Sequence, residues 1–481
     1  MDLLTKQDDK LFIVTAPDEK LRVGDVIQSG SIISQVVEIR FADLPGILEH
    51  VLRQSLIPRS NTIENASEQI KTMFGTVADS KLVLTKIRGH IKTQNGVEIF
   101  KQGLLDFDIS REKTKPMVIS TEKLMTLLGL NFSSNSIAKT ISSEKETQFD
   151  FIPNRFGINL ITGVKGSGKS YFSKRLLLKL IKAKVLTIVF DVNGEYQDLD
   201  KDENGQPNEY AGTILTLERQ LQTPQGNKQP FRIPLYEMRS TDFCKAVNIN
   251  DQQVTFGTIL RFWNENHGIQ FGLDDLAAFA TNLQGQRNDS VKETILDRVN
   301  TARAMRLFEG TMDWNQTLTK YKDGGAIIIN LSEEPNYLLS IMVKFILKSA
   351  ERWVKQRQKG ISLFLEEAQN YVESDSDFRD ILTRMRHIGA YPTFITNDPT
   401  TLPEEVMALA DNVISFRFES DTVLNHLSKS GKIDNDTLKN LRSMEDGQCI
   451  CIGKFTNNFP FFLSVGKEQG VKMAGETKPL V

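Results

Sequence analysis

The pattern of apolar and polar positions changes near residue 150. Before that point, short β-branched runs such as KLFIVTA, VGDVIQ and SIISQVVEIRF are separated by Gly, Asn, Asp and Pro. Regularly spaced runs of this kind are typical of the strands of a small all-β domain. We therefore expect a small β-barrel over residues 1–112, with one helical excursion around LPGILEHVLRQ at residues 44–54.

After residue 150, apolar strands alternate with long amphipathic helices. GINLIT, KVLTIVFDV, AIIINLS and ISLFLEE have the pattern of strands, whereas YFSKRLLLKLIKA and LLSIMVKFILKSAERWVKQR have the period of helices. Such alternation is typical of a mostly parallel sheet that is covered by helices on both faces. The fold class predicted for this part of the chain is therefore α/β.

Composition and period also suggest the remaining boundaries. Residues 113–150 are rich in Lys, Ser, Thr and Glu around one short helix candidate, STEKLMTLLGL, which indicates a linker with a docking helix. Strand patterns disappear between residues 240 and 321, where we expect a helical insertion. The α/β core would then consist of residues 151–239 and 322–466, followed by a C-terminal tail, residues 467–481.

The net charge restricts the kinds of molecule that the protein can bind. A formal charge of −2 and a pI near 6.3 exclude a globally basic binder, so any contact with nucleic acid needs a local patch or a channel formed by several subunits. The N-terminal residues lack a signal-peptide pattern, and no apolar run approaches the ~20 residues of a membrane span. Three cysteines lack metal-site spacing and fit the core of a cytoplasmic protein.

The first strand of the predicted core leads into GVKGSGKS, which matches G-x-x-x-x-G-K-[ST] in full. Glycines allow successive backbone N–H groups to face phosphate oxygens at the N-terminus of a helix. Lys169 would reach the β- and γ-phosphates, and the Ser170 hydroxyl would ligate Mg²⁺. A flexible Gly/Ser loop is the alternative, but the flanking strand and helix argue against it. The predicted nucleotide-binding residues are Gly163, Val164, Lys165, Gly166, Ser167, Gly168, Lys169, Ser170 and Tyr171.

A second strand, LFLEEAQNYV, ends in two adjacent glutamates. In P-loop proteins an acidic residue at the end of a neighbouring strand holds the metal bound to the nucleotide, and we assign Glu366 to that role together with Ser170. Glu367 suits a general base that orients and deprotonates an attacking water. The alternative is an acidic cap for the next helix, which the upstream P-loop makes the weaker interpretation.

Further polar residues also end strands. Asp191 ends the second core strand beside the P-loop and is a candidate for the nucleotide site. FITNDP ends another strand with Thr396 and Asn397, which could sense the γ-phosphate or position the water, or could simply form a strand-end turn.

Arginines after the paired glutamates offer a candidate for the neighbouring subunit's site. Arg379, Arg384 and Arg386 lie along a predicted helix, and such a row is usually a solvated face. An arginine finger that acts across a subunit boundary would come from a similar position, with Arg386 the first choice and Arg384 the second.

TGVKGSGKS, FDVNGEY, IINLS, FLEEAQNY and TNDPTTLPEEVMALADNVISFR occur in an order and spacing that resemble the HerA-like ATPases, which are related to FtsK and to conjugative ATPases. LRVGDVIQ…IISQVVEI is similar to the barrel of that family, and the resemblance extends from about residue 20 to 465. The ending LEEA is closer to HerA than to the conjugative ATPases. The sequence departs from the family at Gly157, where an arginine is frequent, and at Asn397–Asp398–Pro399, where Gln-Arg-Pro or a similar triplet is common.

The resemblance implies a RecA-like P-loop core that binds ATP and Mg²⁺ and forms a homo-hexameric ring around double-stranded DNA. It also implies a separate nuclease or sirtuin-type effector at the barrel side, in DNA end processing or, for bacterial members, antiphage defence. The leading hypothesis is thus a DNA translocase or helicase. The alternative is a nucleotide-regulated ring that assembles and activates the effector with little translocation. A small-molecule kinase is disfavoured by the barrel and by Glu367.

Overall fold

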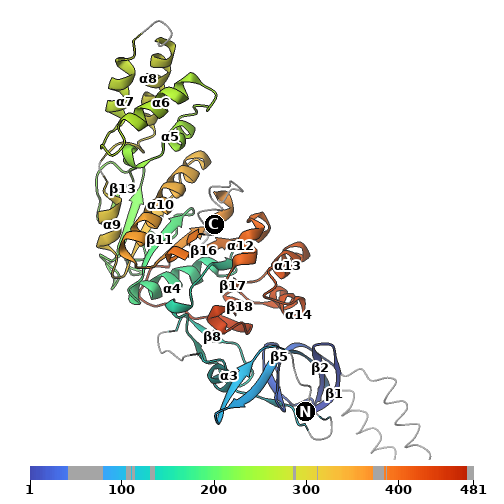
Figure 1. The fold of residues 1–481 in the computed structure, drawn as a ribbon. Coiled ribbons are helices and arrows are strands. Elements are labelled where there is room, and N and C mark those ends of the chain that lie inside the picture. The colour runs from blue at the N-terminus through green and yellow to red at the C-terminus, as the bar shows by residue number, and fades with distance from the viewer. Residues whose placement is uncertain are drawn as a thin grey trace, which may run out of the picture. The chain divides into compact units, whose positions relative to one another are not determined.

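The chain forms two compact units, and Figure 1 draws both of them. The barrel unit comprises Met1–Ile152 and Val413–Gly466, and the core unit comprises Pro153–Asn412 and Lys467–Val481. A computed structural model describes residues 1–41, 80–103, 110, 114–130, 136–284, 289–310, 312–371, 384–385 and 387–473. The helix predicted at residues 44–54 lies outside these residues.

An antiparallel sheet forms the N-terminal part of the barrel unit, as the alternating pattern predicts. Its strands follow the order β1-β2-β5-β4-β3-β7, and β6 pairs with β5. Side chains from five of these strands, among them Leu3, Ile13 and Val36, meet in one apolar core, so the sheet curls into a small barrel (Figure 1). The strands are β1 (Asp2–Gln7), β2 (Lys10–Thr15), β3 (Val26–Ser29), β4 (Ile32–Phe41), β5 (Lys81–Gln94), β6 (Val97–Lys101) and β7 (Met117–Val118).

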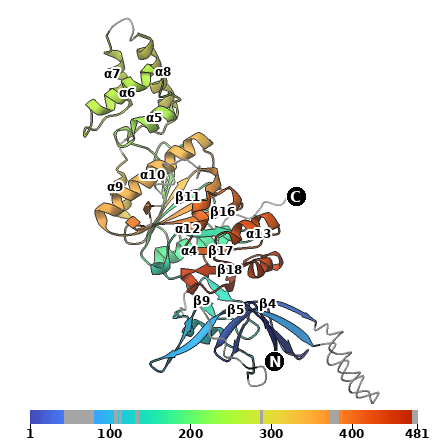
Figure 2. The same cartoon turned by 45° about the vertical axis from the view of Figure 1, so that its right-hand side comes forward.

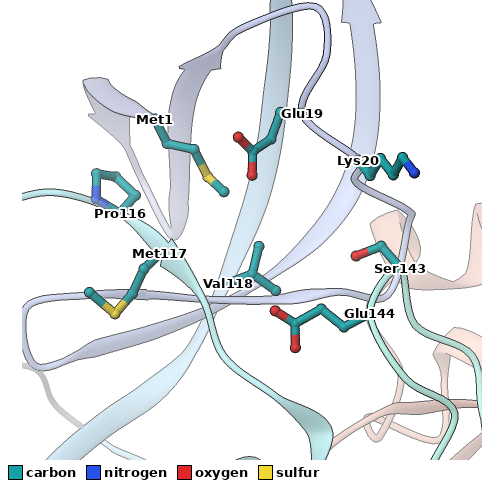
Figure 3. A pocket seen from close by; sticks show the side chains of 8 residues that line it. All are labelled: Met1, Glu19, Lys20, Pro116, Met117, Val118, Ser143 and Glu144. Carbon is teal, nitrogen blue, oxygen red and sulfur yellow. The ribbon is translucent and has the colours of Figure 1, made fainter.

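The two end strands of this sheet are bridged by side chains. Lys115, just before β7, pairs with Asp2 of β1 at 2.7 Å. Beside them lies a pocket of about 490 Å³ (Figure 3), whose lining includes Met1 and Met117. Lys20 is its only cationic side chain, against the two carboxylates of Glu19 and Glu144, so this pocket is not built for a phosphate group.

The rest of the barrel unit contains the predicted docking helix, α3 (Thr121–Leu127). The Ser120 hydroxyl caps α3 by accepting from the backbone N–H of Lys123, and the helix buries Leu124, Met125 and Leu127. A second group of strands follows the order β17-β18-β19-β8-β9. These elements are β8 (Ala138–Thr140), β9 (Gln148–Phe149), β17 (Asn412–Ser415), α13 (Asp421–Ser428), α14 (Asn435–Leu438), β18 (Gln448–Gly453) and β19 (Phe461–Val465).

A cluster of charged residues joins β5 to α14 within the barrel unit. We call it the β5–α14 junction and define it as Lys86, Arg88, Asp434, Asp436 and Thr437. Arg88 donates to Asp434 at 2.6 Å and to the Thr437 hydroxyl at 2.5 Å, while its Nε reaches the side chain of Gln35. All three guanidinium nitrogens therefore have a partner. Asp434 also caps α14 by accepting from the Thr437 N–H at 3.0 Å.

The core unit contains a parallel sheet with the strand order β13-β12-β14-β11-β15-β16-β10, of which Figure 2 labels β11 and β16. Every residue of β10, β11 and β15 is buried, which means that both faces of the sheet are covered. The strands are β10 (Asn159–Thr162), β11 (Leu186–Asp191), β12 (Ile214–Glu218), β13 (Lys228–Pro230), β14 (Gly325–Asn330), β15 (Ile361–Glu366) and β16 (Ala390–Thr396). The main helices between them are α4 (Lys169–Lys182) and α10 (Asn336–Arg357).

The strand order fixes where the candidate residues meet. Strand β16 separates β10, which precedes the P-loop, from β15, which ends in the paired glutamates. Since parallel strands place their carboxyl ends at the same edge of a sheet, the residue after β16 falls between the P-loop and those glutamates. Strand β11 flanks β15 on the other side and brings Asp191 to the same edge.

Between Ser240 and Lys320 the described residues form helices joined by turns and contain no strand, as expected for an insertion. Trp263 anchors one of these helices by donating from its indole nitrogen to the carbonyl of Met238 at 2.9 Å. The helices are α5 (Ser240–Ala246), α6 (Val254–Glu265), α7 (Leu273–Thr281), α8 (Asp289–Ala304) and α9 (Trp314–Lys320). Across the described parts of the chain, no helix has the length and apolar character needed to cross a membrane.

Candidate nucleotide-binding and hydrolysis site

The predicted P-loop connects β10 directly to α4. Gly166 and Gly168 have φ angles of 82° and 108°, a region that residues with a Cβ rarely adopt, so these two positions require glycine. The Ser167 hydroxyl donates to the carbonyl of Val164 at 2.7 Å and tightens the curl. Gly168 is the N-cap of α4, which places the loop at the positive end of the helix dipole.

Lys169 opens the first turn of α4 and is largely buried. Its ammonium group donates to the carbonyl of Val164 at 3.0 Å and to the side-chain oxygen of Asn397. Burial lowers the pKa of Lys169 to about 8, although the nearby carboxylate of Glu367 acts in the opposite direction. A desolvated cation beside a helix N-terminus is unfavourable by itself and is well suited to receive a phosphate anion.

Glu366 ends β15 with only 1% of its surface exposed. Its Oε2 accepts from the backbone N–H of Asn193 at 3.5 Å, whereas Oε1 has no hydrogen-bond partner among the described residues. Burial, followed by repulsion from Asp191 and Glu195, raises the pKa of Glu366 well above its usual range. A buried carboxylate with an unsatisfied oxygen is costly, and a bound cation would remove that cost.

Asp191 uses its carboxylate to shape the turn after β11. It accepts from the backbone N–H groups of Glu195 at 2.9 Å and Tyr196 at 3.0 Å. Burial raises the pKa of Asp191 despite these two hydrogen bonds. Asp191, which the sequence assigns to the nucleotide site, therefore lies at the edge of that site, next to Glu366. There its carboxylate orders the FDVNGEY turn and adds negative charge.

The residues present have the chemistry to hold a magnesium ion when nucleotide is bound. No group of three or more His, Cys, Asp or Glu side chains in the described residues could hold a metal alone. Mg²⁺ typically takes one or two protein oxygens and completes its shell with phosphates and waters. The unsatisfied Oε1 of Glu366 and the hydroxyl of Ser170 in the first turn of α4 would supply those protein oxygens.

Glu367 follows Glu366 with φ 44° and ψ 49°, a left-handed conformation that is uncommon for glutamate. Asn397 donates from its side-chain amide to Glu367 Oε1 at 2.6 Å, and Gln369 donates to Oε2 at 2.6 Å. The Asn397 side chain therefore contacts both Lys169 and Glu367. The sequence placed Asn397 at this edge of the sheet, but it gave no reason to single out Gln369, which lies in the short turn Ala368–Asn370.

Other candidates lie at the periphery. The Tyr171 hydroxyl accepts from the backbone N–H of Glu468 at 2.5 Å, so this residue contacts the C-terminal segment of the core unit. Arg384 is exposed, and Arg386 lies outside the described residues. Either arginine as a finger in a neighbouring subunit stays a prediction.

The departure at Gly157 has a steric cause. A Cβ atom at Gly157 would lie 2.1 Å from Oδ2 of Asp411, and the same oxygen accepts from the backbone N–H of Ile158 at 3.0 Å. Asp411 thus occupies the space that a side chain at position 157 would need, at the start of the strand that leads to the P-loop.

Comparisons with known proteins agree with this geometry. The family model "Helicase HerA, central domain" matches residues 159–350. The "Probable helicase MJ1565" of Methanocaldococcus jannaschii is 22% identical over 350 residues, which are 67% of this chain and 64% of that protein. The "DNA double-strand break repair helicase HerA" of Saccharolobus solfataricus is 20% identical over 351 residues, which are 68% of each chain.

A comparison with solved structures gives lower sequence identities. VirB4 of Thermoanaerobacter pseudethanolicus has 13% identity and a TM-score of 0.49, and the alignment covers 70% of this chain and 98% of that one. Since the family model covers β10, the P-loop, α4 and β11 and extends through α10, it includes the phosphate-binding half of the site. Residues 159–350 match the HerA central domain, and over this part the chain is similar to proteins named as HerA-type helicases.

Proposed function

We propose that this protein hydrolyses ATP and uses the energy to translocate along, or to unwind, double-stranded DNA as a hexameric ring. The observation that carries the proposal is the set of contacts at the end of β16, where Asn397 contacts both Lys169 and Glu367. A kinase transfers the phosphoryl group to a second substrate, whereas a carboxylate beside the metal ligand suits activation of water. The relatives named as helicases support DNA as the substrate.

In the proposed reaction, the P-loop amides and Lys169 hold the β- and γ-phosphates. Magnesium, held by Ser170 and Glu366, would offset the charge of the phosphates. Glu367 accepts a proton from a water whose oxygen forms a bond to the γ-phosphorus. The bond from that phosphorus to the β–γ bridging oxygen breaks, and the products are ADP and inorganic phosphate. In the ring, Arg384 or Arg386 of a neighbouring subunit would face the γ-phosphate.

The test is the ATPase rate of the purified chain with and without linear double-stranded DNA, with Glu367→Gln as the blank. Loss of a general base costs roughly 10²–10⁴-fold in rate, so the blank should be nearly silent. Strong stimulation by linear duplex, together with displacement of a third strand from triplex DNA, is the expected result. Retained hydrolysis in Glu367→Gln would contradict the assignment of the base.

A second candidate is the nucleotide-regulated scaffold. In this structure Glu367 and Lys169 are both held by protein side chains, and a site of this kind can change its contacts when nucleotide binds. Measurable turnover that is indifferent to DNA would favour this candidate. A nuclease or sirtuin-type effector at the barrel side, with a role in antiphage defence or end processing, belongs to both proposals. Pull-down from cells that carry the neighbouring genes would identify it.

A further inference from the structure

The backbone of Glu367 alone does not explain where its carboxylate points. Glu367 lies in the left-handed region at φ 44°, a conformation that is costly for a non-glycine residue and persists where the surroundings impose it. The surroundings here include a short turn in which the backbone N–H of Asn370 donates to the carbonyl of Glu367 at 2.9 Å. The same turn directs the side chain of Gln369 back toward the carboxylate.

The orientation of the Gln369 amide is determined by Thr396. The backbone N–H of Asp398 donates to the Thr396 hydroxyl oxygen at 3.0 Å. The hydroxyl hydrogen of Thr396 is therefore available for Gln369 Oε1, at 2.7 Å. With its oxygen facing Thr396, Gln369 presents its NH₂ group to Glu367 Oε2 at 2.6 Å.

The two amides that hold Glu367 differ in their other partners. Asn397 is shared with Lys169, which is the group that reaches the β- and γ-phosphates in a P-loop site. Bound nucleotide would attract Lys169 toward its phosphates, and this attraction would weaken the contact between Lys169 and Asn397. The second partner of Gln369 is the Thr396 hydroxyl, which is not part of the phosphate-binding loop. The hold of Gln369 on Glu367 does not depend on Lys169.

We propose that Gln369 is a positioning residue for hydrolysis, which with Thr396 keeps the Glu367 carboxylate oriented toward water after nucleotide has bound. The inference rests on the proposed role of Glu367 as the base. Gln369 acts through Glu367, because its side chain contacts Glu367 and Thr396. It should therefore affect the chemical step and leave the affinity for ATP unchanged.

The experiment compares Gln369→Met with the wild-type chain. Methionine keeps the length of the side chain and removes both polar groups, which limits damage to the fold. We expect kcat to fall about 10–100-fold, the loss typical of a misplaced catalytic group, while the Kd for ATP stays within about twofold. A kcat within twofold of wild type, or a loss that appears in Kd instead, would overturn the proposal.

Thr396 supplies a matched pair of variants. Thr396→Ser keeps the hydroxyl and should keep kcat within about threefold, whereas Thr396→Val removes it and should reproduce part of the Gln369→Met loss. If Gln369→Met is poorly folded by circular dichroism, this pair still decides the question, because equal rates for serine and valine would overturn the proposal. Residues that act as one unit give non-additive losses, so Gln369→Met with Thr396→Val should be no slower than Gln369→Met alone.

Two further measurements separate this inference from the proposed function. In a Glu367→Gln background, Gln369→Met should not lower the residual rate further, because its target is gone. A further drop there would mean that Gln369 has a role of its own, which overturns the proposal. If Glu367→Gln itself keeps full activity, the proposed base is wrong. If Glu367→Gln is inactive and Gln369→Met is not impaired, only the positioning role fails.

Discussion

The β5–α14 junction contains partly buried charged groups and the nucleotide site contains buried ones, and the two places differ in how these charges are paired. At the junction, each nitrogen of Arg88 has a partner, and Asp434 accepts from Arg88 and from Thr437. At the nucleotide site, one oxygen of the buried Glu366 has no hydrogen-bond partner among the described residues, and burial depresses the pKa of Lys169.

This difference distinguishes charged groups that stabilise the fold from charged groups that bind a ligand. A buried charge whose hydrogen bonds are complete holds two segments together, and removing one member leaves the other uncompensated. A buried group that lacks a partner is costly to keep charged, and a ligand of opposite charge would stabilise its charged form. Substitutions at the junction should therefore change stability, whereas those at the nucleotide site should change binding and turnover.

The largest expected effect is at Lys169. Lys169→Ala should weaken ATP binding by about 3 kcal/mol, roughly 100-fold or more, because it removes the buried cation that meets the phosphates. The free energy of unfolding without nucleotide should change by less than about 1 kcal/mol, since the charge is desolvated without a carboxylate in hydrogen-bond contact. Calorimetric titration with ATP measures the first quantity. Lys182→Ala, at the exposed end of α4, is the matched control and should bind normally.

At the junction, Arg88→Ala should lower the stability of the barrel unit by about 3 kcal/mol, because the partly buried Asp434 would lose its charged partner and Thr437 and Gln35 would each lose a donor. Hydrogen exchange of the β5 and α14 amides should speed up by roughly 100-fold, which is the same free energy. Lys10→Ala removes a more exposed ion pair with Asp436 and should cost about 0–1 kcal/mol. Equal losses of stability for Arg88→Ala and Lys10→Ala would contradict the expectation that the less exposed ion pair contributes more.

Acid should weaken the same junction. Burial of Asp434 by itself would raise its pKa, but the Arg88 charge and the hydrogen bonds of Thr437 hold the pKa at about 2. Because the folded value lies below the unfolded value of about 3.9, the stabilisation is complete above about pH 4 and is lost as the pH falls toward 2. We expect about 1–2 kcal/mol, after allowance for solvent screening. Unfolding curves of wild type and Asp434→Asn should converge in this pH range, and parallel curves would contradict the assignment.

The smallest expected effect has the opposite sign. Glu366→Gln should abolish turnover and yet raise the free energy of unfolding by about 1 kcal/mol at pH 8.5, because it removes a buried charge next to Asp191. The pKa of Glu366 is raised in the folded state, so the wild type loses stability as the pH rises above the unfolded value. The gain should therefore be smaller at pH 6. Thermal unfolding at the two pH values measures it, and a loss of stability at pH 8.5 would show that Glu366 is a structural residue.

Local patterns in the sequence predicted most of the site. The P-loop, the paired glutamates and the strand-end residue Asn397 each carry a short signal, because glycine, charge and strand termination are visible within a few positions. The sequence does not indicate Gln369, because the role of this residue depends on a hydrogen bond from Thr396, which lies on another strand. Asp191 was placed at the site, but the sequence does not indicate that its carboxylate is engaged by the turn that follows it.

The sequence likewise predicted some strands of the fold and missed others. Strands β10, β11, β14 and β15 are long apolar runs, and the sequence located each of them. It missed β12 (Ile214–Glu218) and β13 (Lys228–Pro230), where Thr, Glu, Lys and Gln dilute the apolar pattern. Residues 413–466 group with residues 1–152 in the barrel unit, and their assignment to the α/β core stays a prediction. Contacts such as Arg88 with Asp434 join these distant segments, and no local period in the sequence reports them.

The close approach of Asp411 to Gly157 has a consequence for how this sequence can vary. Any side chain at position 157 must displace the carboxylate that receives the N–H of Ile158, so an arginine there is excluded as a single step. A relative with arginine at the equivalent position needs a smaller or differently placed residue opposite it. Across an alignment of relatives, the two positions should therefore vary together: glycine with aspartate in one group, and a large residue without that aspartate in the other.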